Sequence, residues 1–318
     1  MIITNDKPVL VHISNWHRKW IIGGIFREAA EACSIEASWQ VYPTSKRDFL
    51  NPKVWMTKLN PQFGNLNVYT HQDTYFSIFE ANSEQLKGSR NRVFITHLND
   101  GHSFNELQIT ALQYCERLLV QNVGMENLLT SLGISKERIV RAPGAVNRDA
   151  YKPSENLPES QYVLFSGDFK YRKNPELVAR VVESMPDINF IVHGQNWEIF
   201  PPQFLRGLPN LKRLDFDLKN QPHLIRQAST YVSLALIEGG PYPVLESLAS
   251  GTPVVATDTG FCAEFVNSAN GRLLPNQPDI KLVESSIRDA IGMKESVWGK
   301  DLLNGTWQWK DIGQLIYL

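Results

Sequence analysis

The sequence has few cysteines, no secretory signal and no long apolar run. Its three cysteines are far apart and lack metal-ligand spacing: Cys33, Cys115 and Cys262. An odd, sparse set of thiols is typical of a reducing compartment. No basic region leads into an apolar stretch near residue 1, and no window approaches the roughly 18 consecutive apolar residues of a membrane-spanning helix. We therefore expect a cytoplasmic protein.

An excess of charge of one sign is also absent. The 32 Lys and Arg residues nearly balance 33 Asp and Glu, for a net charge of −1. This balance argues against a nucleic-acid binder, whose phosphate contacts need a cationic surplus. Hydrophobic residues make up 42% of the chain and charged residues 20%, which excludes wholesale disorder. The 318 residues fit about two domains at roughly 150 residues each.

The first half alternates short apolar runs with amphipathic segments, which predicts a parallel sheet covered by helices. The glycine pair Gly23-Gly24 is expected to precede a helix that begins near Ile25, and a second helix is predicted over 125–132. The predicted strands are 9–13, 37–42, 66–69, 93–96, 118–120 and 139–141.

A polar segment with two prolines, residues 147–160, predicts a linker. The alternation then resumes, with predicted strands at 162–166, 188–193, 211–216, 231–236 and 253–257 and helices at 175–185, 222–228 and 244–249. We therefore expect two doubly wound α/β domains, 1–150 and 151–300, followed by a tail, 301–318. A ligand would bind in the cleft between them, at the carboxyl ends of the strands.

Glycine and proline gather around residues 239–275, beside two carboxylates. Glu238 ends an apolar strand, Gly239 and Gly240 follow it, and Glu246 falls in the first turn of the next predicted helix. Glycine lets a backbone approach a ligand closely. The backbone amides of Val244 and Leu245 would face a phosphate at the positive end of that helix. Carboxylates accept hydrogen bonds from sugar hydroxyls, so the segment suits a phosphate flanked by polyols. Without the surrounding motif, the two glutamates would more simply be a solvated loop residue, Glu238, and a carboxylate that complements the helix dipole, Glu246.

Residues 238–260 resemble the Glu-seven-residues-Glu signature of the family 4 retaining glycosyltransferases, with departures at Ser247 and in the loop glycines. Two further stretches agree in order and spacing, Gly260–Val266 and Asn270–Pro275. The resemblance implies the GT-B fold, in which two Rossmann-like domains face a central cleft. It also implies transfer of a sugar from a nucleoside diphosphate sugar with retention of configuration.

The resemblance further predicts a cationic clamp for the donor diphosphate within residues 167–174. Lys173 falls on the lysine of the family. The arginine position is occupied by Asp168, which cannot donate to phosphate. Lys170 and Arg172 both remain candidates for the missing cation, because either brings positive charge.

In the first half the resemblance is weaker. Gly23-Gly24 is similar to the glycine loop under the donor phosphates, and His97, after a strand, is similar to the histidine that faces the donor sugar. His71 and His102 are rival candidates. Two other segments match the family loosely, Gln121-Asn122 and 143–147, and residues 306–317 resemble a terminal helix that crosses back to the first domain.

The implied function is metal-independent glycosyl transfer to a glycan, lipid-linked or small-molecule acceptor bound by the first domain, without a cofactor. Glu246 would hold the ribose. Glu238 and the two glycines would hold the donor sugar, His97 would orient it, and Lys173 with the two amides would stabilise the leaving diphosphate. We identify no Asp-x-Asp pair as a site for a metal-bound nucleotide.

Two alternatives stay open. One is a nucleotide-sugar epimerase on the same scaffold, and the other is a degenerate glycosyltransferase-like binding subunit, supported by Asp168 and by the short first half. The aromatic and cationic stretch 16–22 suits either peripheral contact with the inner face of a membrane or a structural loop, which we favour.

Overall fold

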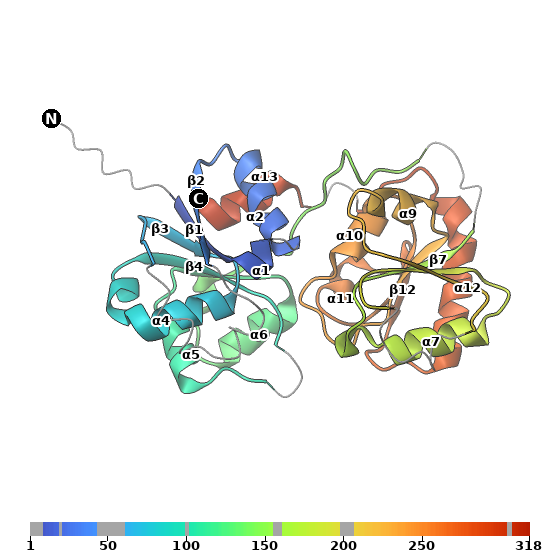
Figure 1. Ribbon diagram of the computed structural model, residues 1–318, viewed down its shortest axis with the longest axis horizontal. Helices are drawn as coiled ribbons and strands as arrows, with labels where there is room; N and C mark the ends of the chain where they lie inside the picture. The colour runs from blue at the N-terminus through green and yellow to red at the C-terminus, as the bar shows by residue number, and fades with distance from the viewer. Residues whose placement is uncertain are drawn as a thin grey trace. The chain divides into compact units, whose positions relative to one another are not determined.

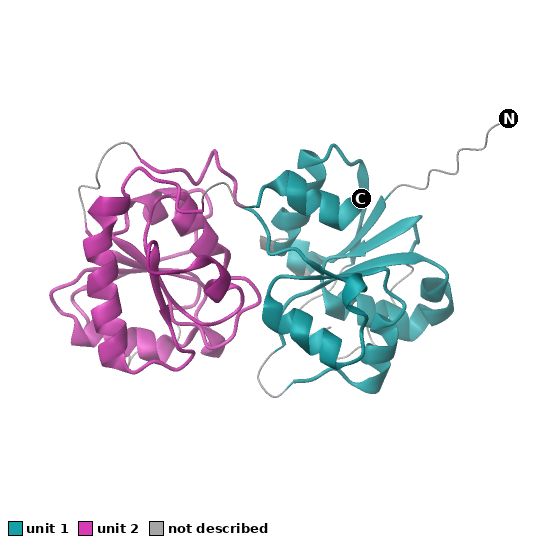
Figure 2. Cartoon of the chain, turned by 180° about the vertical axis from the view of Figure 1, so that it is seen from behind, with its two compact units in different colours: residues 1–145, 307–318 teal, residues 146–306 magenta. Residues whose placement is uncertain are grey.

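The computed structural model describes residues 9–18, 21–42, 61–98, 102–154, 161–197, 207–303 and 307–318. The chain divides into two compact units: unit 1 comprises 1–145 and 307–318, and unit 2 comprises 146–306 (Figure 2). In the described residues each unit contains a parallel six-stranded sheet flanked by helices (Figure 1). The predicted α/β class with two Rossmann-like domains is confirmed.

In unit 1 the strands run, in sheet order, β2 (Ala37–Tyr42), β1 (Val9–Ser14), β3 (Leu66–Tyr69), β4 (Arg90–Ile95), β5 (Arg117–Val120) and β6 (Ile139–Arg141). Its helices are α1 (Asn15–Arg18), α2 (Ile21–Ala32), α4 (Gln72–Lys87), α5 (Glu106–Leu112), α6 (Val123–Ser131) and α13 (Trp309–Tyr317). Figure 1 shows α2 and α13 on one face of the sheet and α4, α5 and α6 on the other.

In unit 2 the sheet order is β12 (Gly271–Leu274), β11 (Val254–Thr257), β10 (Thr230–Ser233), β7 (Val163–Ser166), β8 (Phe190–His193) and β9 (Leu211–Leu214). Its helices are α7 (Pro175–Ser184), α9 (Gln221–Gln227), α10 (Tyr242–Ala249), α11 (Cys262–Phe265) and α12 (Ile280–Val297). This is the strand order of a Rossmann sheet, with its switch point between β7 and β10, where the chain order reverses. The corresponding switch point of unit 1 lies between β1 and β3.

Both faces of the unit 2 sheet are buried, which explains its apolar strands. Leu164 and Tyr231 belong to a core with α9 and α10, whereas Phe165 and Val232 belong to a second core with α7 and α12. Neighbouring residues along a strand thus alternate between two apolar layers. A parallel sheet covered in this way leaves its strand ends as the place for polar function.

Most predicted strands and helices are present, with shifted ends. The strand predicted to reach 236 ends at Ser233, and the helix predicted from 244 begins at Tyr242 with Pro243 in its first turn. Proline is tolerated there because the first-turn amides have no partner within the helix. The sequence pattern does not predict five of the described α-helices, α1, α4, α5, α11 and α12, or the strand β12.

The helix α13 packs on α2 and so returns the chain to unit 1. Its Gly313 lies so close to α2 that a Cβ atom there would be 2.3 Å from the carbonyl oxygen of Ala29. The fully buried guanidinium of Arg92, on β4, donates to the carbonyl oxygen of Ile316 at 2.9 Å. The close packing at Gly313 and the hydrogen bond from Arg92 therefore hold α13 against unit 1.

Residues 147–154, the first part of the predicted linker, pack on unit 2. Tyr151 is buried in its core, and the Arg226 guanidinium donates to the carbonyl oxygen of Ala150 at 2.6 Å. The remainder of that segment, 155–160, lies outside the described residues.

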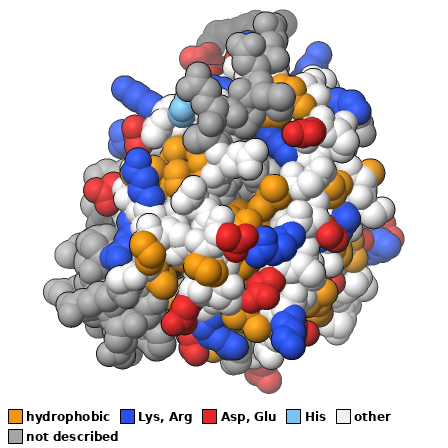
Figure 3. All heavy atoms as spheres, turned by 90° about the vertical axis from the view of Figure 1, so that its right-hand side faces the viewer, with side chains coloured by type: hydrophobic (Ala, Val, Ile, Leu, Met, Phe, Trp, Pro, Cys, Tyr) orange, Lys and Arg blue, Asp and Glu red, His pale blue; other side chains and the backbone are white. Residues whose placement is uncertain are grey.

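Acidic and basic side chains are interspersed on the face of the molecule drawn in Figure 3, as the net charge of −1 leads one to expect. An example of such surface pairing is Arg288 with Asp187, whose Nη1 and Oδ2 atoms are 2.8 Å apart. Within the part of the chain that the structure describes, no helix combines the length and apolarity needed to cross a bilayer.

Candidate functional site

Charged residues of unit 2 gather at the carboxyl ends of β7 and β10, on either side of the switch point. Gly167 follows β7 directly and opens a loop that ends in the 3₁₀ helix Tyr171–Lys173. Glu238 lies in the loop between β10 and α10. Crevices at such switch points are where open α/β sheets bind ligands.

Two cations converge on one carboxylate there. The Nη1 atom of Arg172 lies 2.7 Å from Oε2 of Glu238, and the Nζ atom of Lys173 lies 2.5 Å from Oε1. The side chain of Glu238 is only 7% exposed. Burial by itself would raise the pKa of this carboxyl, but Lys173 and Arg172 outweigh burial and lower it. The structure thus brings three of the predicted site residues together as an ionised cluster.

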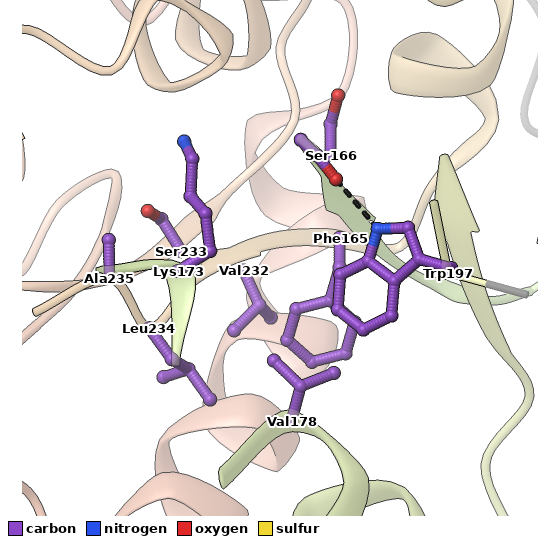
Figure 4. A pocket seen from close by; sticks show the side chains of 10 residues that line it. Phe165, Ser166, Lys173, Val178, Trp197, Val232, Ser233, Leu234 and Ala235 are labelled. Carbon is purple, nitrogen blue, oxygen red and sulfur yellow. Dashed lines mark hydrogen bonds between the residues drawn. The ribbon is translucent and has the colours of Figure 1, made fainter. Parts of the chain in front are cut away.

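The loop that carries these cations is held against β7. Gly167 has φ = 141°, and a Cβ there would lie 3.2 Å from Cε of Lys173. The indole Nε1–H of Trp197 donates to the carbonyl oxygen of Gly167 at 2.7 Å, and the backbone N–H of Leu236 donates to that of Arg172 at 2.8 Å. Lys173 and Trp197 line a small cavity of about 20 Å³, which has room for roughly one water. Figure 4 shows the side chains around it. Residues 167–174, here called the clamp loop, are therefore held in place by contacts with Trp197 and Leu236.

Asp168 and Lys170 form a separate pair on the same loop. Oδ2 of Asp168 lies 3.2 Å from Nζ of Lys170. Asp168 occupies the arginine position of the family motif. Of the two candidate replacements, Arg172 shares Glu238 with Lys173, whereas Lys170 pairs with Asp168. The geometry favours Arg172.

Glu246, eight residues after Glu238, is buried at 7% exposure. Its Oε2 atom accepts a hydrogen bond from Nε2 of Gln221 at 2.9 Å, and its carboxylate also accepts one from the hydroxyl of Tyr151. Burial raises the pKa of Glu246 to about 7, against the lowering effect of the two hydrogen bonds. It is not the simple first-turn partner of a helix dipole.

Sequence reasoning missed Gln221, Tyr151 and His193. Gln221 is the first residue of α9, and its Oε1 atom lies 3.0 Å from Nδ1 of His193, the last residue of β8. The one sequence signal for His193 is its position at the end of a predicted strand. Nothing in the sequence marks Gln221, because its partners are about 25 or more residues away along the chain.

The prediction that the backbone amides of Val244 and Leu245 face outward is wrong. Since α10 begins at Tyr242, the N–H of Val244 donates to the carbonyl oxygen of Pro241 at 2.9 Å. Leu245 is the fourth helical residue, where hydrogen bonding within the helix has already begun. Both side chains are buried in the core of unit 2. Neither residue presents its amide as predicted.

The loop glycines Gly239 and Gly240 lie between Glu238 and α10, as expected. The backbone of Gly239 is close to Gly260, where a Cβ would be 2.7 Å from the Gly239 carbonyl oxygen. Gly260 has φ = 58°, a conformation that favours glycine. The family-like Gly260 thus has a structural role in shaping the Glu238 loop.

Gly23 and Gly24 also need correction, because they lie inside α2 rather than in a loop before it. A Cβ at Gly23 would be 2.6 Å from the carbonyl oxygen of Arg18, so this glycine permits the close packing of α1 on α2. A Cβ at Gly24 would meet nothing within 4 Å. The helix thus begins four residues before the predicted start at Ile25, and Gly23 is its third residue.

The three candidate histidines differ in their surroundings. His97 is half-buried, two residues after β4, and its carbonyl oxygen accepts a hydrogen bond from Nε2 of Gln72 at 3.4 Å. His71 caps α4, accepting from the Asp73 amide at 3.2 Å. His102 is exposed. His97, which matches the histidine of the family, thus follows the end of a strand, whereas His71 caps a helix.

Other family-like positions also have structural partners. Asn122 caps α6 by accepting from the Met125 amide at 2.8 Å, and Gln121 is buried. Of the predicted membrane or structural loop 16–22, residues 19 and 20 lie outside the described part. Within the described residues no group of three or more His, Cys, Asp or Glu is arranged to hold a metal ion.

Part of the chain is similar to known protein families. Residues 147–297, just under half of the chain, match the family model described as "Glycosyl transferases group 1". Over 227 residues the chain is 20% identical to a phosphatidylinositol N-acetylglucosaminyltransferase subunit of Arabidopsis thaliana, covering 67% of this chain and 50% of that protein. It is 27% identical to the O-antigen biosynthesis glycosyltransferase WbnH of Escherichia coli over 154 residues, 48% of this chain and 44% of that one. The chain spans about half the length of these relatives.

Solved structures resemble the whole chain at low identity. Sucrose-phosphate synthase from Thermosynechococcus elongatus has a TM-score of 0.70 at 14% identity, covering 98% of this chain and 95% of its own. Anabaena Alr3699/HepE in complex with UDP-glucose has a TM-score of 0.68 at 12% identity, with the same coverage. The chain therefore has the GT-B fold, and its unit 2 matches the glycosyl transferases group 1 family.

Proposed function

We propose that the protein is a retaining glycosyltransferase that moves a sugar from a nucleoside diphosphate sugar to an acceptor. The observation that carries the proposal is the convergence of Arg172 and Lys173 on Glu238 at the switch point of unit 2. The family match of residues 147–297 supports it, as does the UDP-glucose complex of a structural neighbour.

The donor diphosphate would take the place of Glu238 as partner of the two cations. Arg172 and Lys173 already lie within 2.7 Å of carboxylate oxygens, which are anionic like the oxygens of a phosphate. A guanidinium grips phosphate through two N–H groups, and an ammonium adds a point charge. As the glycosyl bond breaks, both stabilise the growing charge of the leaving diphosphate.

These cations supply the charge that a metal would otherwise bring, so transfer is proposed to proceed without a metal or other cofactor. Activity measured in the presence of a chelator tests this. Loss of transfer that added Mg²⁺ or Mn²⁺ restores would contradict it.

We assign Glu246 to the ribose hydroxyls, and Glu238 with Gly239 and Gly240 to the donor sugar. An ionised carboxylate accepts hydrogen bonds at about four lone-pair sites, and Glu246 is buried in the same unit as the clamp loop. His97 of unit 1 is proposed to orient the transferred sugar, and unit 1 is proposed to bind the acceptor.

Retention follows if the acceptor attacks the face that the diphosphate leaves. The acceptor proton then passes to a leaving phosphate oxygen, and no protein base is required. The anomeric configuration of the product, read by NMR, tests this step, and an inverted product would contradict it.

The test of the donor site is calorimetry against uridine and guanosine diphosphates with wild type and Glu246→Gln. The variant keeps the side-chain volume and replaces an acceptor oxygen by an NH₂ group. We expect binding by wild type and a loss on the order of tenfold or more in the variant. Unchanged affinity and unchanged transfer would contradict the assignment.

A degenerate binding subunit is the second candidate, favoured by one observation. Asp168 brings a carboxylate to the clamp loop, where it pairs with Lys170. Nucleotide binding without donor turnover in the presence of any offered acceptor would support this candidate. Donor conversion without acceptor would instead indicate an epimerase.

A further inference from the structure

We propose that Gln221 is a positioning residue that fixes the carboxylate of Glu246 as a hydrogen-bond acceptor for two neighbouring ribose hydroxyls. This proposal rests on the proposed function, since it needs a nucleotide to bind beside Glu246. Its basis is a chain of hydrogen bonds that crosses the carboxyl edge of the unit 2 sheet and ends on Glu246.

The chain starts at a backbone amide, whose direction is fixed. The N–H of Asp217 donates to Nε2 of His193 at 2.9 Å. A backbone amide can only donate, so Nε2 must be the acceptor nitrogen of this imidazole. The proton of the neutral ring is then on Nδ1, which lies 3.0 Å from Oε1 of Gln221. Burial lowers the pKa of His193 and keeps the ring neutral.

The orientation of the Gln221 amide follows. Its Oε1 atom accepts from Nδ1–H of His193 and from the hydroxyl of Ser166, whose Oγ lies 3.1 Å away. Both donors come from the last residues of adjacent strands, which pair in register. With both lone pairs of Oε1 occupied, the NH₂ group must face the other way, toward Oε2 of Glu246 at 2.9 Å.

Glu246 therefore receives a donor that cannot flip. Without it, the buried carboxyl would lose a hydrogen bond that favours its ionised form and would take up a proton more readily, which would make it a donor toward the ligand. Gln221 and Tyr151 together use two of the four lone-pair sites of the ionised carboxylate. A vicinal diol needs two acceptor positions, and we propose that it uses the two sites that remain. The chain of hydrogen bonds thus selects ribose over deoxyribose.

The test compares nucleotide discrimination in three proteins: wild type, Gln221→Met and Gln227→Met. Methionine keeps the length of glutamine and removes its amide. Gln227 is at the other end of the same helix, α9, and provides the matched control. The probes are uridine diphosphate and its 2′-deoxy and 3′-deoxy forms, with the guanosine series in parallel, and the readout is the ratio of deoxy to ribo dissociation constants.

We expect wild type and Gln227→Met to prefer the ribonucleotide on the order of tenfold or more, and Gln221→Met to lose most of that preference. A general loss of structure would weaken ribo and deoxy probes alike and leave the ratio unchanged. A second variant, Gln221→Glu, removes the donor and keeps a polar side chain, and the same loss is expected.

Retention of wild-type discrimination by Gln221→Met and Gln221→Glu would overturn the positioning role and leave the proposed function intact. Equal binding of ribo and deoxy probes by wild type would also overturn it. If wild type bound no nucleoside diphosphate, both the positioning role and the proposed function would fall.

Discussion

The two sheets reverse their strand order at one switch point each, yet the side chains there differ in charge. In unit 2, Arg172, Lys173 and Glu238 form an ionised cluster. In unit 1 the switch point carries His17 and His71, whose rings stack at 4.2 Å. Burial lowers the pKa of both histidines to about 3, so both are neutral at pH 7.

The hydrogen bonds of the two switch points differ in the same sense. Ser14 caps α1 by accepting from the His17 amide at 3.1 Å, and its Oγ lies 3.0 Å from Nδ1 of the same histidine. His71 caps α4. At its switch point, unit 1 uses polar side chains to cap helices. At the corresponding point, unit 2 holds two cations paired with one carboxylate. The same topological position thus holds helix caps in one domain and a buried group of ion pairs in the other.

The largest expected effect comes from removing a charge at the switch point of unit 2. Lys173→Met leaves Glu238 with Arg172 alone and takes one cation from the leaving diphosphate. Loss of a preorganised electrostatic contact costs about 10²–10³-fold in rate, and we expect that loss in kcat for donor turnover. Lys170→Met is the control, with a change of a few-fold at most. Equal losses in both variants would contradict the choice of Arg172 over Lys170.

A pH titration separates Glu246 from its ionised neighbour Glu238. Burial raises the pKa of Glu246 from its ordinary 4.5 to about 7. The stability it contributes is therefore complete below pH 4.5 and is lost as pH rises to about 7. Relative to Glu246→Gln, the free energy of unfolding of wild type should fall by on the order of 3 kcal/mol across this window.

Denaturant unfolding of both proteins between pH 4.5 and 8 measures this difference. A constant difference would show that Glu246 stays ionised throughout. The groups that face its carboxyl, Gln221 and Tyr151, are unchanged in the comparison.

Helix packing gives a third contrast between the units. Gly313→Ala in unit 1 places a Cβ 2.3 Å from the Ala29 carbonyl oxygen, and overpacking of this kind costs about 1–3 kcal/mol. Gly292→Ala in α12 of unit 2 meets nothing within 4 Å and should stabilise by about 0.5–1 kcal/mol, since alanine favours helix. Thermal unfolding of the two variants should therefore shift Tm in opposite directions. A shift in the same direction would contradict the close α2–α13 crossing.

The smallest effect tests the capping role of His71. Loss of an N-cap acceptor in His71→Ala should destabilise by about 1 kcal/mol, and His71→Asn should restore most of it. His102→Ala, at an exposed position, should change stability by less than about 0.5 kcal/mol. If His71→Asn were as unstable as His71→Ala, the histidine would act through something other than its cap.

The parts of the molecule that the sequence predicts well are those encoded by neighbouring residues. Apolar strands such as 66–69 and 139–141 match β3 and β6 in full. The motif from Glu238 to Gly260 is also recognisable, because its residues are near one another in the sequence. The clamp loop is likewise a local motif, and its departure at Asp168 is visible in the sequence as well.

What escaped prediction depends on contacts between distant segments. Gln221 gains its position only where β7, β8 and α10 meet. The predicted start of α10 is two residues late because Pro243 is compatible with both a loop and a first helical turn. A glycine pair in a sequence suggests a loop, so Gly23 is predicted to lie before the helix. The structure needs a glycine there because of the nearby carbonyl oxygen of Arg18, and this contact exists only in the folded chain.

The return of α13 to unit 1 affects the order in which the two units can be completed during synthesis. On the ribosome, the partner of the α2 surface is made only after all of unit 2 has been synthesised, since residues 309–317 follow it in the chain. Domains generally fold as they emerge, N-terminal parts first. The α2 surface of unit 1 therefore stays uncovered until α13 has been synthesised. Unit 2 is one continuous segment, so all of its residues are synthesised before unit 1 is complete.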